Sequence, residues 1–236
     1  MNLVLFTDDD LVAPATIRLT DRRARHIRRV HRAEVGEQLV VGRLHGDLGQ
    51  GTITRLEAGL VEMDVAFTGP PPPPAPVVVI LALPRPKGLR RMLEHLPTFG
   101  VEQLILVNAF RVEKSYWSSP LLAPETIEHH LRLGLEQARD TRPPIIQLKR
   151  FFRPFVEDEL PAMVDGRRRL LAHPAAEVPC PHAVASPVAL AIGPEGGWID
   201  FELNLLQAAG FERVHAGPRI LRTEAALPHL LGRILL

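Results

Sequence analysis

Two glycine-rich loops near the end of the chain contain the side chains best suited to chemistry. Residues 193–197 (GPEGG) hold one carboxylate, Glu195, and residues 217–224 (GPRILRTE) hold two guanidinium groups, Arg219 and Arg222. A carboxylate can accept a proton, and a fixed guanidinium can stabilise negative charge that develops during a reaction. Each loop follows a short apolar run, and ligands of open α/β sheets bind beside the carboxyl ends of strands. The two loops together predict a site for a small polar ligand.

A purely structural role for these charges is the alternative at this stage. Glu195 could accept hydrogen bonds from the backbone of its own turn, and Arg222 and Glu224 could be ordinary charges at a helix end. The main-chain N–H groups of the two loops do not depend on protonation, so they are the simplest ligand-binding groups to expect here.

The segments around the loops predict strands and helices that position them. Residues 188–192 (VALAI) predict a buried strand that runs into the first loop. Asp200 predicts the N-cap of a helix that Gly210 ends, and a strand at residues 213–215 precedes the second loop. Thr223 offers a hydroxyl cap for the last helix, whereas Pro228 predicts that regular helical hydrogen bonding begins near Ala226.

Upstream of these segments, strand and helix signals alternate, which predicts an α/β domain with a parallel sheet. The expected strands are residues 77–82, 103–108, 145–148 and 168–172. The expected helices are one that ends at residue 99 and two more at residues 124–138 and 155–163.

The first third of the chain predicts a separate, small antiparallel barrel. Short apolar runs alternate with glycine turns around one basic helix, expected at residues 21–31. Gly69, the prolines 70–74, Ala75 and Pro76 predict a stiff spacer that joins no sheet. The expected apolar strands are residues 2–6, 38–41, 52–56 and 60–67. The expected parts are therefore residues 1–69 as the barrel, 70–76 as a proline-rich linker and 77–236 as the α/β domain.

The charge pattern adds a candidate surface for RNA. The formal net charge is only +1, but residues 18–34 contain seven arginines against Asp21 and Glu34. A concentrated arginine face is typical of phosphate contact, and a solvated helix surface is the alternative.

Composition narrows the class of protein. Cys180 is the only cysteine, so no intrachain disulfide is possible, and no metal-ligand spacing appears. The first residues lack the pattern of a signal peptide, and no apolar run is long enough for a membrane span. The loop GPEGG lacks the G-x-G-x-x-G spacing of a dinucleotide site. We expect a cytoplasmic protein that binds neither metal nor membrane.

Several motifs resemble one family. IGPEGGW (192–198), HAGPRILRTE (215–224), RVEKSYW (111–117) and LEQARDTRPP (135–144) are similar to the ribosomal RNA small subunit methyltransferase E family, and RHIRRVHRAEVGEQL (25–39) is similar to its RNA-binding domain. The resemblance implies methylation of N3 of a uridine in 16S rRNA with S-adenosylmethionine. It also implies a knotted SPOUT domain after a PUA-like barrel, a homodimer, and 16S rRNA in the small ribosomal subunit as partner.

The resemblance also implies roles for individual residues. Three loops, at residues 172–174, 193–197 and 217–223, are expected at the cofactor. Glu195 is the candidate for accepting the N3 proton or orienting the base, and Arg222, secondarily Arg219, for stabilising charge on the uracil oxygens. The expected cofactor-binding residues are Ala172, His173, Ile192, Gly193, Gly196, Gly197, Gly217, Ile220, Leu221 and Thr223. The expected RNA contacts are Arg22, Arg25, Arg28, Arg29, Arg32, Arg85, Lys87, Arg111, Arg139 and Arg219.

Two segments depart from the family pattern and indicate a divergent branch. Residues 95–100 read HLPTFG, and residues 222–228 read RTEAALP. Two other functions therefore stay open. One is a methyltransferase of the same fold that acts on a different RNA base or a ribose, and the other is a non-catalytic RNA-binding ribosome-assembly factor.

Overall fold

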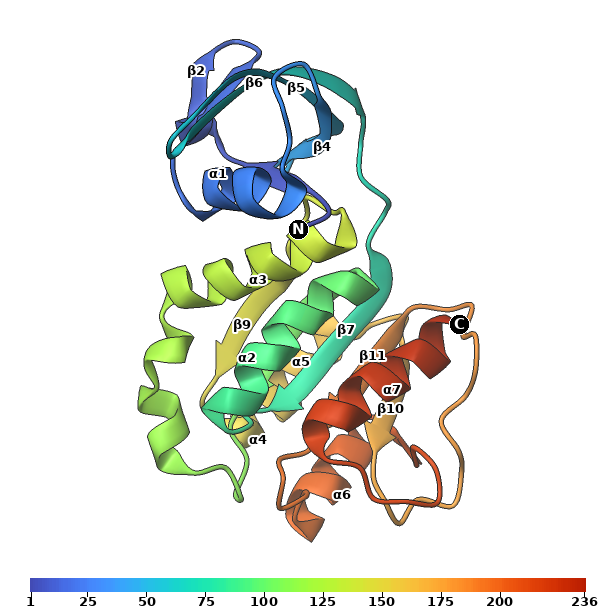
Figure 1. The fold of residues 1–236 in the computed structure, drawn as a ribbon. Helices are drawn as coiled ribbons and strands as arrows, with labels where there is room; N and C mark the ends of the chain where they lie inside the picture. Colours follow the sequence, from blue (N-terminus) through green and yellow to red (C-terminus); the bar gives the residue numbers. More distant parts are fainter. The chain divides into compact units, whose positions relative to one another are not determined.

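The computed structural model describes residues 1–236 and divides into two compact units. Unit 1 consists of Met1–Pro73 and Leu131–Pro143, and unit 2 consists of Pro74–His130 and Pro144–Leu236 (Figure 1). The division therefore falls inside helix α3, Pro124–Ala138. The sequence does not indicate that residues 131–143 belong to unit 1, because residues 124–138 form one continuous helical pattern.

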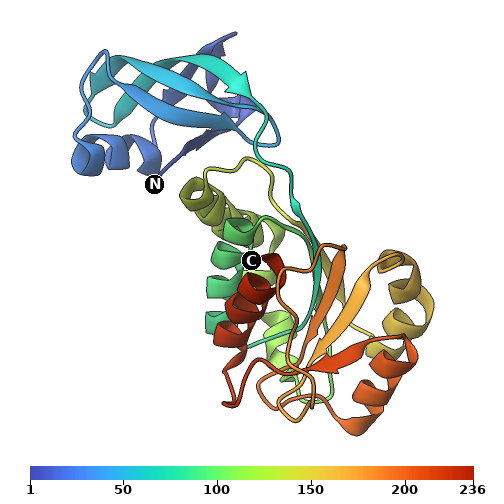
Figure 2. The ribbon, with the colours of Figure 1, turned by 90° about the vertical axis from the view of Figure 1, so that its right-hand side faces the viewer.

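Unit 1 contains a curved six-stranded sheet with the strand order β1-β4-β5-β6-β3-β2 (Figure 2). The strands are β1 (Val4–Phe6), β2 (Leu11–Ala13), β3 (Thr16–Leu19), β4 (Gln38–Arg43), β5 (Leu48–Glu57) and β6 (Leu60–Gly69). The sequence missed β2 and β3. It was also wrong to expect only antiparallel pairs, because β1 runs parallel to β4. These two strands are not joined by a hairpin, since two strands and a helix lie between them in the chain.

The basic helix of unit 1 has two parts. Asp21 caps α1 (Arg22–His26) by accepting a hydrogen bond from the backbone N–H of Arg23. A π-helical stretch, η2 (Ile27–His31), continues it and ends at Arg32, which has a left-handed backbone with φ of 54°. Ala24 and Ile27 are buried in the core of unit 1, whereas Arg25, Arg28 and Arg29 are exposed.

Unit 2 contains a six-stranded sheet with the order β12-β10-β11-β7-β8-β9, in which every pair is parallel. The strands are β7 (Ala75–Ala82), β8 (Val101–Val107), β9 (Ile145–Lys149), β10 (Arg168–Ala172), β11 (Val188–Ile192) and β12 (Glu212–Val214). Residues 77–82 of β7 and all residues of β11 are buried, as expected for strands covered on both faces.

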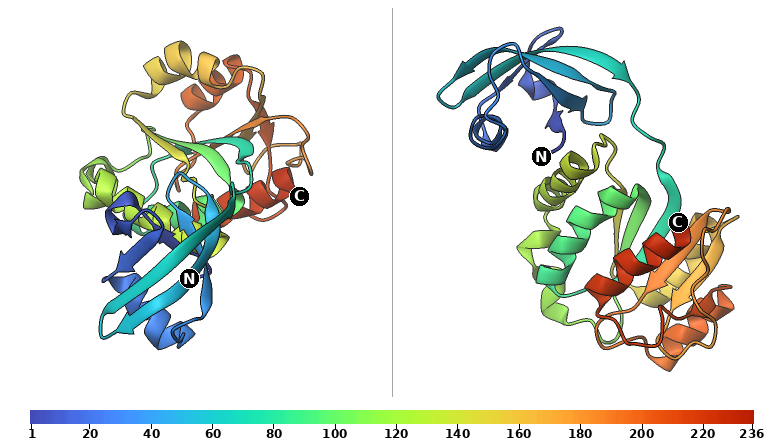
Figure 3. Two further views of the ribbon diagram at one scale, coloured as in Figure 1. Left: turned by 90° about the horizontal axis from the view of Figure 1, so that it is seen from above. Right: turned by 45° about the vertical axis from the view of Figure 1, so that its right-hand side comes forward.

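Helices cover both faces of this sheet. Helices α2 (Pro86–His95) and α7 (Thr223–Leu235) pack together on one face, and α6 (Asp200–Ala208) lies with the segment that contains α4 (Phe152–Pro154) and α5 (Leu160–Met163) on the other (Figure 3). No helix combines the length and the apolar composition that a bilayer crossing requires. The knotted path that the resemblance implies stays a prediction.

Three details of unit 2 correct the sequence predictions. Helix α7 begins at Thr223 and not near Ala226, because the N–H groups of Ala225 and Ala226 already donate to the carbonyl of Arg222. Pro228 removes only its own N–H, so the first turn forms ahead of it. Thr223 is buried inside that turn, and Arg222 is the N-cap residue. The linker is shorter than expected, since Gly69 ends β6 and Ala75 and Pro76 begin β7.

The helix expected at residues 155–163 also differs. It begins at Phe152 as α4, passes through a π-helical stretch at Phe155–Glu159, and ends as α5. The other predicted strands and helices of unit 2 are present within a residue or two of the expected bounds, apart from the end of α2. There a 3-10 turn, Leu96–Phe99, follows His95 and ends at Gly100, whose φ is 64°.

Candidate active site

Three loops of unit 2 begin at the same edge of the sheet. Strand β10 lies between β11 and β12, with Ala172 paired with Ile192 on one side and with Val214 on the other. The segments that follow these three residues surround one cleft of about 620 Å³. All ten residues expected to bind the cofactor line the cleft, and so do Glu195, Arg219 and Arg222. The sheet therefore brings together the groups that the two motifs contributed separately.

The first loop is closed by short-range contacts. The N–H of Gly197 donates to the carbonyl of Pro194 at 2.8 Å, and Gly197 has a φ of 74°, a conformation that favours glycine. A Cβ atom on Gly193 would lie 3.0 Å from Nε1 of Trp198, whose ring is buried and packs on Phe152. The backbone of this loop therefore follows the Trp198 ring closely.

Neighbouring loops fix the exposed groups of the first loop. Oε1 of Glu195 accepts a hydrogen bond from the backbone N–H of Arg85 at 3.1 Å. The guanidinium of Arg111 donates to the carbonyl of Gly196. Both partners come from loops that follow other strands, β7 and β8.

The second loop presents main-chain donors to the cleft. The N–H of Gly217 donates to Nδ1 of His215 at 3.0 Å, but the N–H groups of Ile220 and Leu221 donate to no group in the chain. The Ile220 side chain is 83% exposed. Free N–H groups beside an exposed apolar side chain suit a ligand that has both acceptors and a flat apolar part.

Charges around the cleft are mostly positive. Arg85, Arg111, Arg219 and Arg222 line it, against the carboxylates of Glu195 and Glu224. Arg85 and Glu224 form an ion pair at 2.7 Å, and this contact holds the pKa of Glu224 below its usual value. Three buried polar atoms of lining residues have no partner in the chain: Nε of Arg85, Nε1 of Trp198 and Oε2 of Glu224. Buried polar atoms are usually paired, so these three atoms are exceptions in the wall of the cleft.

His173 lies in the loop after β10 in its neutral form. Its Nδ1 accepts a hydrogen bond from the N–H of Ala175 at 3.2 Å. Burial and the positive charge of Arg213 lower the pKa of His173. An acceptor at Nδ1 and a lowered pKa both favour the uncharged ring, so His173 adds no positive charge to the cleft.

Sequence reasoning missed Trp198 and Glu202. Glu202 is 3% exposed, and its carboxylate accepts the N–H of Phe110 at 2.7 Å and the N–H of Ile199 at 3.0 Å. Its place in the first turn of α6, three residues after Ile199, is the usual one for a glutamate that caps a helix start, so a signal was present. Trp198 carries no such signal beyond its position next to Gly197.

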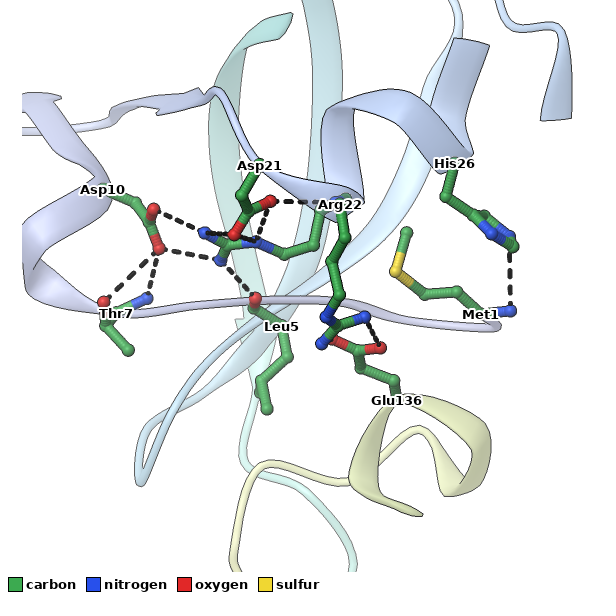
Figure 4. Close-up of polar contacts among 9 residues, drawn as sticks. Met1, Leu5, Thr7, Asp10, Asp21, Arg22, His26 and Glu136 are labelled. Atoms are coloured by element: carbon green, nitrogen blue, oxygen red, sulfur yellow. Dashed lines mark hydrogen bonds and ion pairs between the residues drawn. The ribbon is translucent and has the colours of Figure 1, made fainter. Parts of the chain in front are cut away.

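The residues expected to contact RNA fall into three groups. Arg85, Arg111 and Arg219 line the cleft, and Lys87 lies exposed in the first turn of α2. Arg22, in unit 1, binds Glu136 through two hydrogen bonds of 2.9 and 2.6 Å (Figure 4). It is therefore less available for a phosphate. The remaining five are exposed, and their side chains make no ion pair or hydrogen bond in the chain: Arg25, Arg28, Arg29, Arg32 and Arg139.

Comparison with known proteins identifies the family to which this chain belongs. Residues 71–235 match the family model of the RNA methyltransferase domain. The ribosomal RNA small subunit methyltransferase E of Treponema pallidum is 30% identical over 232 residues, which cover 96% of this chain and 87% of that protein. The chain belongs to the ribosomal RNA small subunit methyltransferase E family. The family membership indicated by the motifs is thereby confirmed.

Solved structures show the same fold over nearly the whole length. The methyltransferase E of Neisseria gonorrhoeae, solved with bound S-adenosyl methionine, is 21% identical with a TM-score of 0.71, over 97% of this chain and 95% of that one. A protein of Legionella pneumophila described as a methyltransferase, solved with the same cofactor, is 22% identical with a TM-score of 0.73, over 98% of this chain and 95% of that one. The expected α/β fold with a preceding β-sheet unit is confirmed.

Proposed function

We propose that the protein transfers the methyl group of S-adenosylmethionine to N3 of a uridine in 16S rRNA. The observation that supports this most directly is the single cleft formed by the loops after β10, β11 and β12, in a chain of this family. A volume of about 620 Å³ lies within the range of small-molecule sites.

The lining fits this cofactor. S-adenosylmethionine has an adenine, ribose hydroxyls and an amino-acid end, and therefore needs donors, acceptors and an apolar wall. The cleft offers the free N–H groups of Ile220 and Leu221 as donors, the exposed carboxylate of Glu195 as an acceptor and the exposed side chain of Ile220 as an apolar wall. The cofactor would supply an electrophilic methyl group on its sulfonium. The residues that would hold it are Ala172, His173, Ile192, Gly193, Gly196, Gly197, Gly217, Ile220, Leu221 and Thr223.

The side chains of the cleft suit the acceptor base. N3 of uracil carries a proton that must leave for the nitrogen to act as a nucleophile. Glu195 is exposed, and because its Oε1 is occupied by Arg85, its Oε2 is free to accept that proton. Arg222 and Arg219 are exposed and unpaired, so their guanidinium groups can stabilise negative charge on the uracil oxygens.

Other exposed groups support an RNA substrate. The Phe110 side chain is 78% exposed next to Arg111, a combination on which an unpaired base can stack. The unpaired arginines of α1 and η2 suit phosphate contact in unit 1. The family resemblance further supports a cytoplasmic homodimer that acts on rRNA of the small ribosomal subunit.

Primer extension on 16S rRNA tests the proposed product. A methyl group on N3 blocks the Watson–Crick edge, so rRNA from cells that contain the protein should give a stop at one uridine that is missing in cells without it. A methylated RNA without such a stop would indicate a different base or a ribose as the acceptor.

Variants of Glu195 test the proposed mechanism with purified protein. E195Q should lower turnover at least tenfold, while calorimetry shows that the affinity for S-adenosylmethionine is retained. Unchanged turnover would remove Glu195 from the mechanism. A wild-type protein that binds RNA but not the cofactor would instead be a non-catalytic RNA-binding factor.

A further inference from the structure

Arg85 contacts both glycine-rich loops of the cleft. It follows β7 and is the N-cap residue of α2. Its backbone N–H donates to Oε1 of Glu195 at 3.1 Å, in the loop after β11. Its guanidinium pairs with Oε1 of Glu224 at 2.7 Å, at the start of α7. The two bonds connect Arg85 to residues that lie 110 and 139 positions later in the chain.

The helix makes no use of the N–H of Arg85. An N-cap residue contributes its carbonyl to the first turn, and here the carbonyl of Arg85 accepts from the N–H groups of Gly88 and Leu89. The N–H is therefore free to bind a side chain outside the helix. Glu195 is exposed and lies among glycines, so little else limits the rotation of its side chain.

We propose that Arg85 is a positioning residue for methyl transfer, in contrast to the RNA contact that the sequence predicts. Its N–H orients the Glu195 carboxylate, and its guanidinium holds the loop that ends at Glu224. This inference rests on the proposed function. In the reaction the N3–H bond breaks and its proton passes to Oε2 of Glu195, while N3 forms a bond to the methyl carbon and the donor leaves as a neutral thioether.

Two substitutions at one position separate the two bonds. R85A removes the guanidinium and keeps the N–H, whereas R85P removes both. Arg85 has φ of −53° and ψ of 146°, which suit a proline that is followed by Pro86. The two variants therefore differ in the N–H that the Glu195 carboxylate accepts.

We expect R85P to have a kcat about threefold to tenfold below that of R85A, with the same KM for S-adenosylmethionine. In an E195A background, the two variants should have equal kcat values, because the group that the N–H orients is gone. An equal kcat of R85P and R85A with Glu195 present would overturn the inference. A difference that persists in the E195A background would also overturn it, since the effect would not pass through Glu195.

Hydrogen exchange gives a second measurement that does not depend on activity or on how well R85P folds. In protein labelled with 15N-arginine, the Arg85 amide should exchange about tenfold faster in E195A than in wild type. Equal exchange rates would show that the bond is absent and overturn the inference. If wild-type protein methylates rRNA but the variants show none of these differences, only the role of Arg85 fails. If wild-type protein transfers no methyl group, the proposed function fails and the role of Arg85 fails with it.

Discussion

Alanine in place of Gly193 should destabilise the fold, whereas alanine in place of Gly232 should stabilise it. At Gly193 the new Cβ would lie 3.0, 3.1 and 3.2 Å from Nε1, Cδ1 and Cε2 of Trp198. The Trp198 ring is 4% exposed and packs on Phe152 at a centroid distance of 5.5 Å, so it has little room to move away. Overpacking of this kind costs about 1–3 kcal/mol.

Gly232 is the matched control in the same unit. It lies inside α7, and a Cβ there would meet no atom within 4 Å. Alanine in place of a helical glycine stabilises by about 0.5–1 kcal/mol. G193A should thus lower the free energy of unfolding, while G232A should raise it.

Thermal unfolding and calorimetry measure both effects. For a chain of this size, each kcal/mol shifts the Tm by about 2–4 °C. G193A should also weaken the binding of S-adenosylmethionine, because Trp198 and Gly193 both line the cleft, whereas G232A should bind as wild type does. A G193A protein with wild-type Tm and wild-type affinity would refute the reasoning, since the loop would then move freely past the ring.

Three further predictions concern charges. R22A leaves the buried Glu136 without its ion pair and should lower the free energy of unfolding by about 1–3 kcal/mol, as measured in urea. As a control, R18A breaks the more exposed pair with Glu62 and should lower it by less than about 1 kcal/mol. Because Arg85 holds the pKa of Glu224 below its usual 4.5, the pair stabilises the fold above that pH and the contribution is lost as the pH falls through the lowered pKa. The stability of wild type relative to E224Q should therefore be greater at neutral pH than in acid; a difference that is constant with pH would contradict this. Glutamine in place of the four unpaired arginines of α1, η2 and its C-cap should reduce the slope of log K against log salt for RNA by about 3, whereas R43Q, which breaks the Asp8 pair, should leave the slope as in wild type. The four are Arg25, Arg28, Arg29 and Arg32.

Local patterns were enough to predict the central elements of unit 2. The run VALAI at residues 188–192 is wholly apolar and ends at a glycine, and it is β11 with the same bounds. The same holds for β10 at residues 168–172 and for α3 at residues 124–138. In each case the signal that starts or ends the element lies within a few residues of it, so no distant contact was needed to find it.

Pairing between distant segments was not predictable in this way. Arg22 and Glu136 lie 114 residues apart, and in the sequence Arg22 is one of seven similar arginines. Only the fold shows that its guanidinium meets a buried carboxylate. The parallel pairing of β1 with β4 was also not predictable, because short strands with glycine turns are equally typical of a purely antiparallel sheet.

The geometry of the cleft depends on residues outside the two motifs that revealed it. Strand β7 lies between β11 and β8, so the loops after β7 and β8 end beside the loop after β11. Three bonds use this proximity: Arg85 binds Glu195, Arg111 binds Gly196, and the N–H of Phe110 binds Glu202. The glycines of the first loop restrict its backbone little, so these bonds add to the internal bond between Gly197 and Pro194. The motifs therefore identify the reacting groups, while the loops after β7 and β8 determine where those groups point.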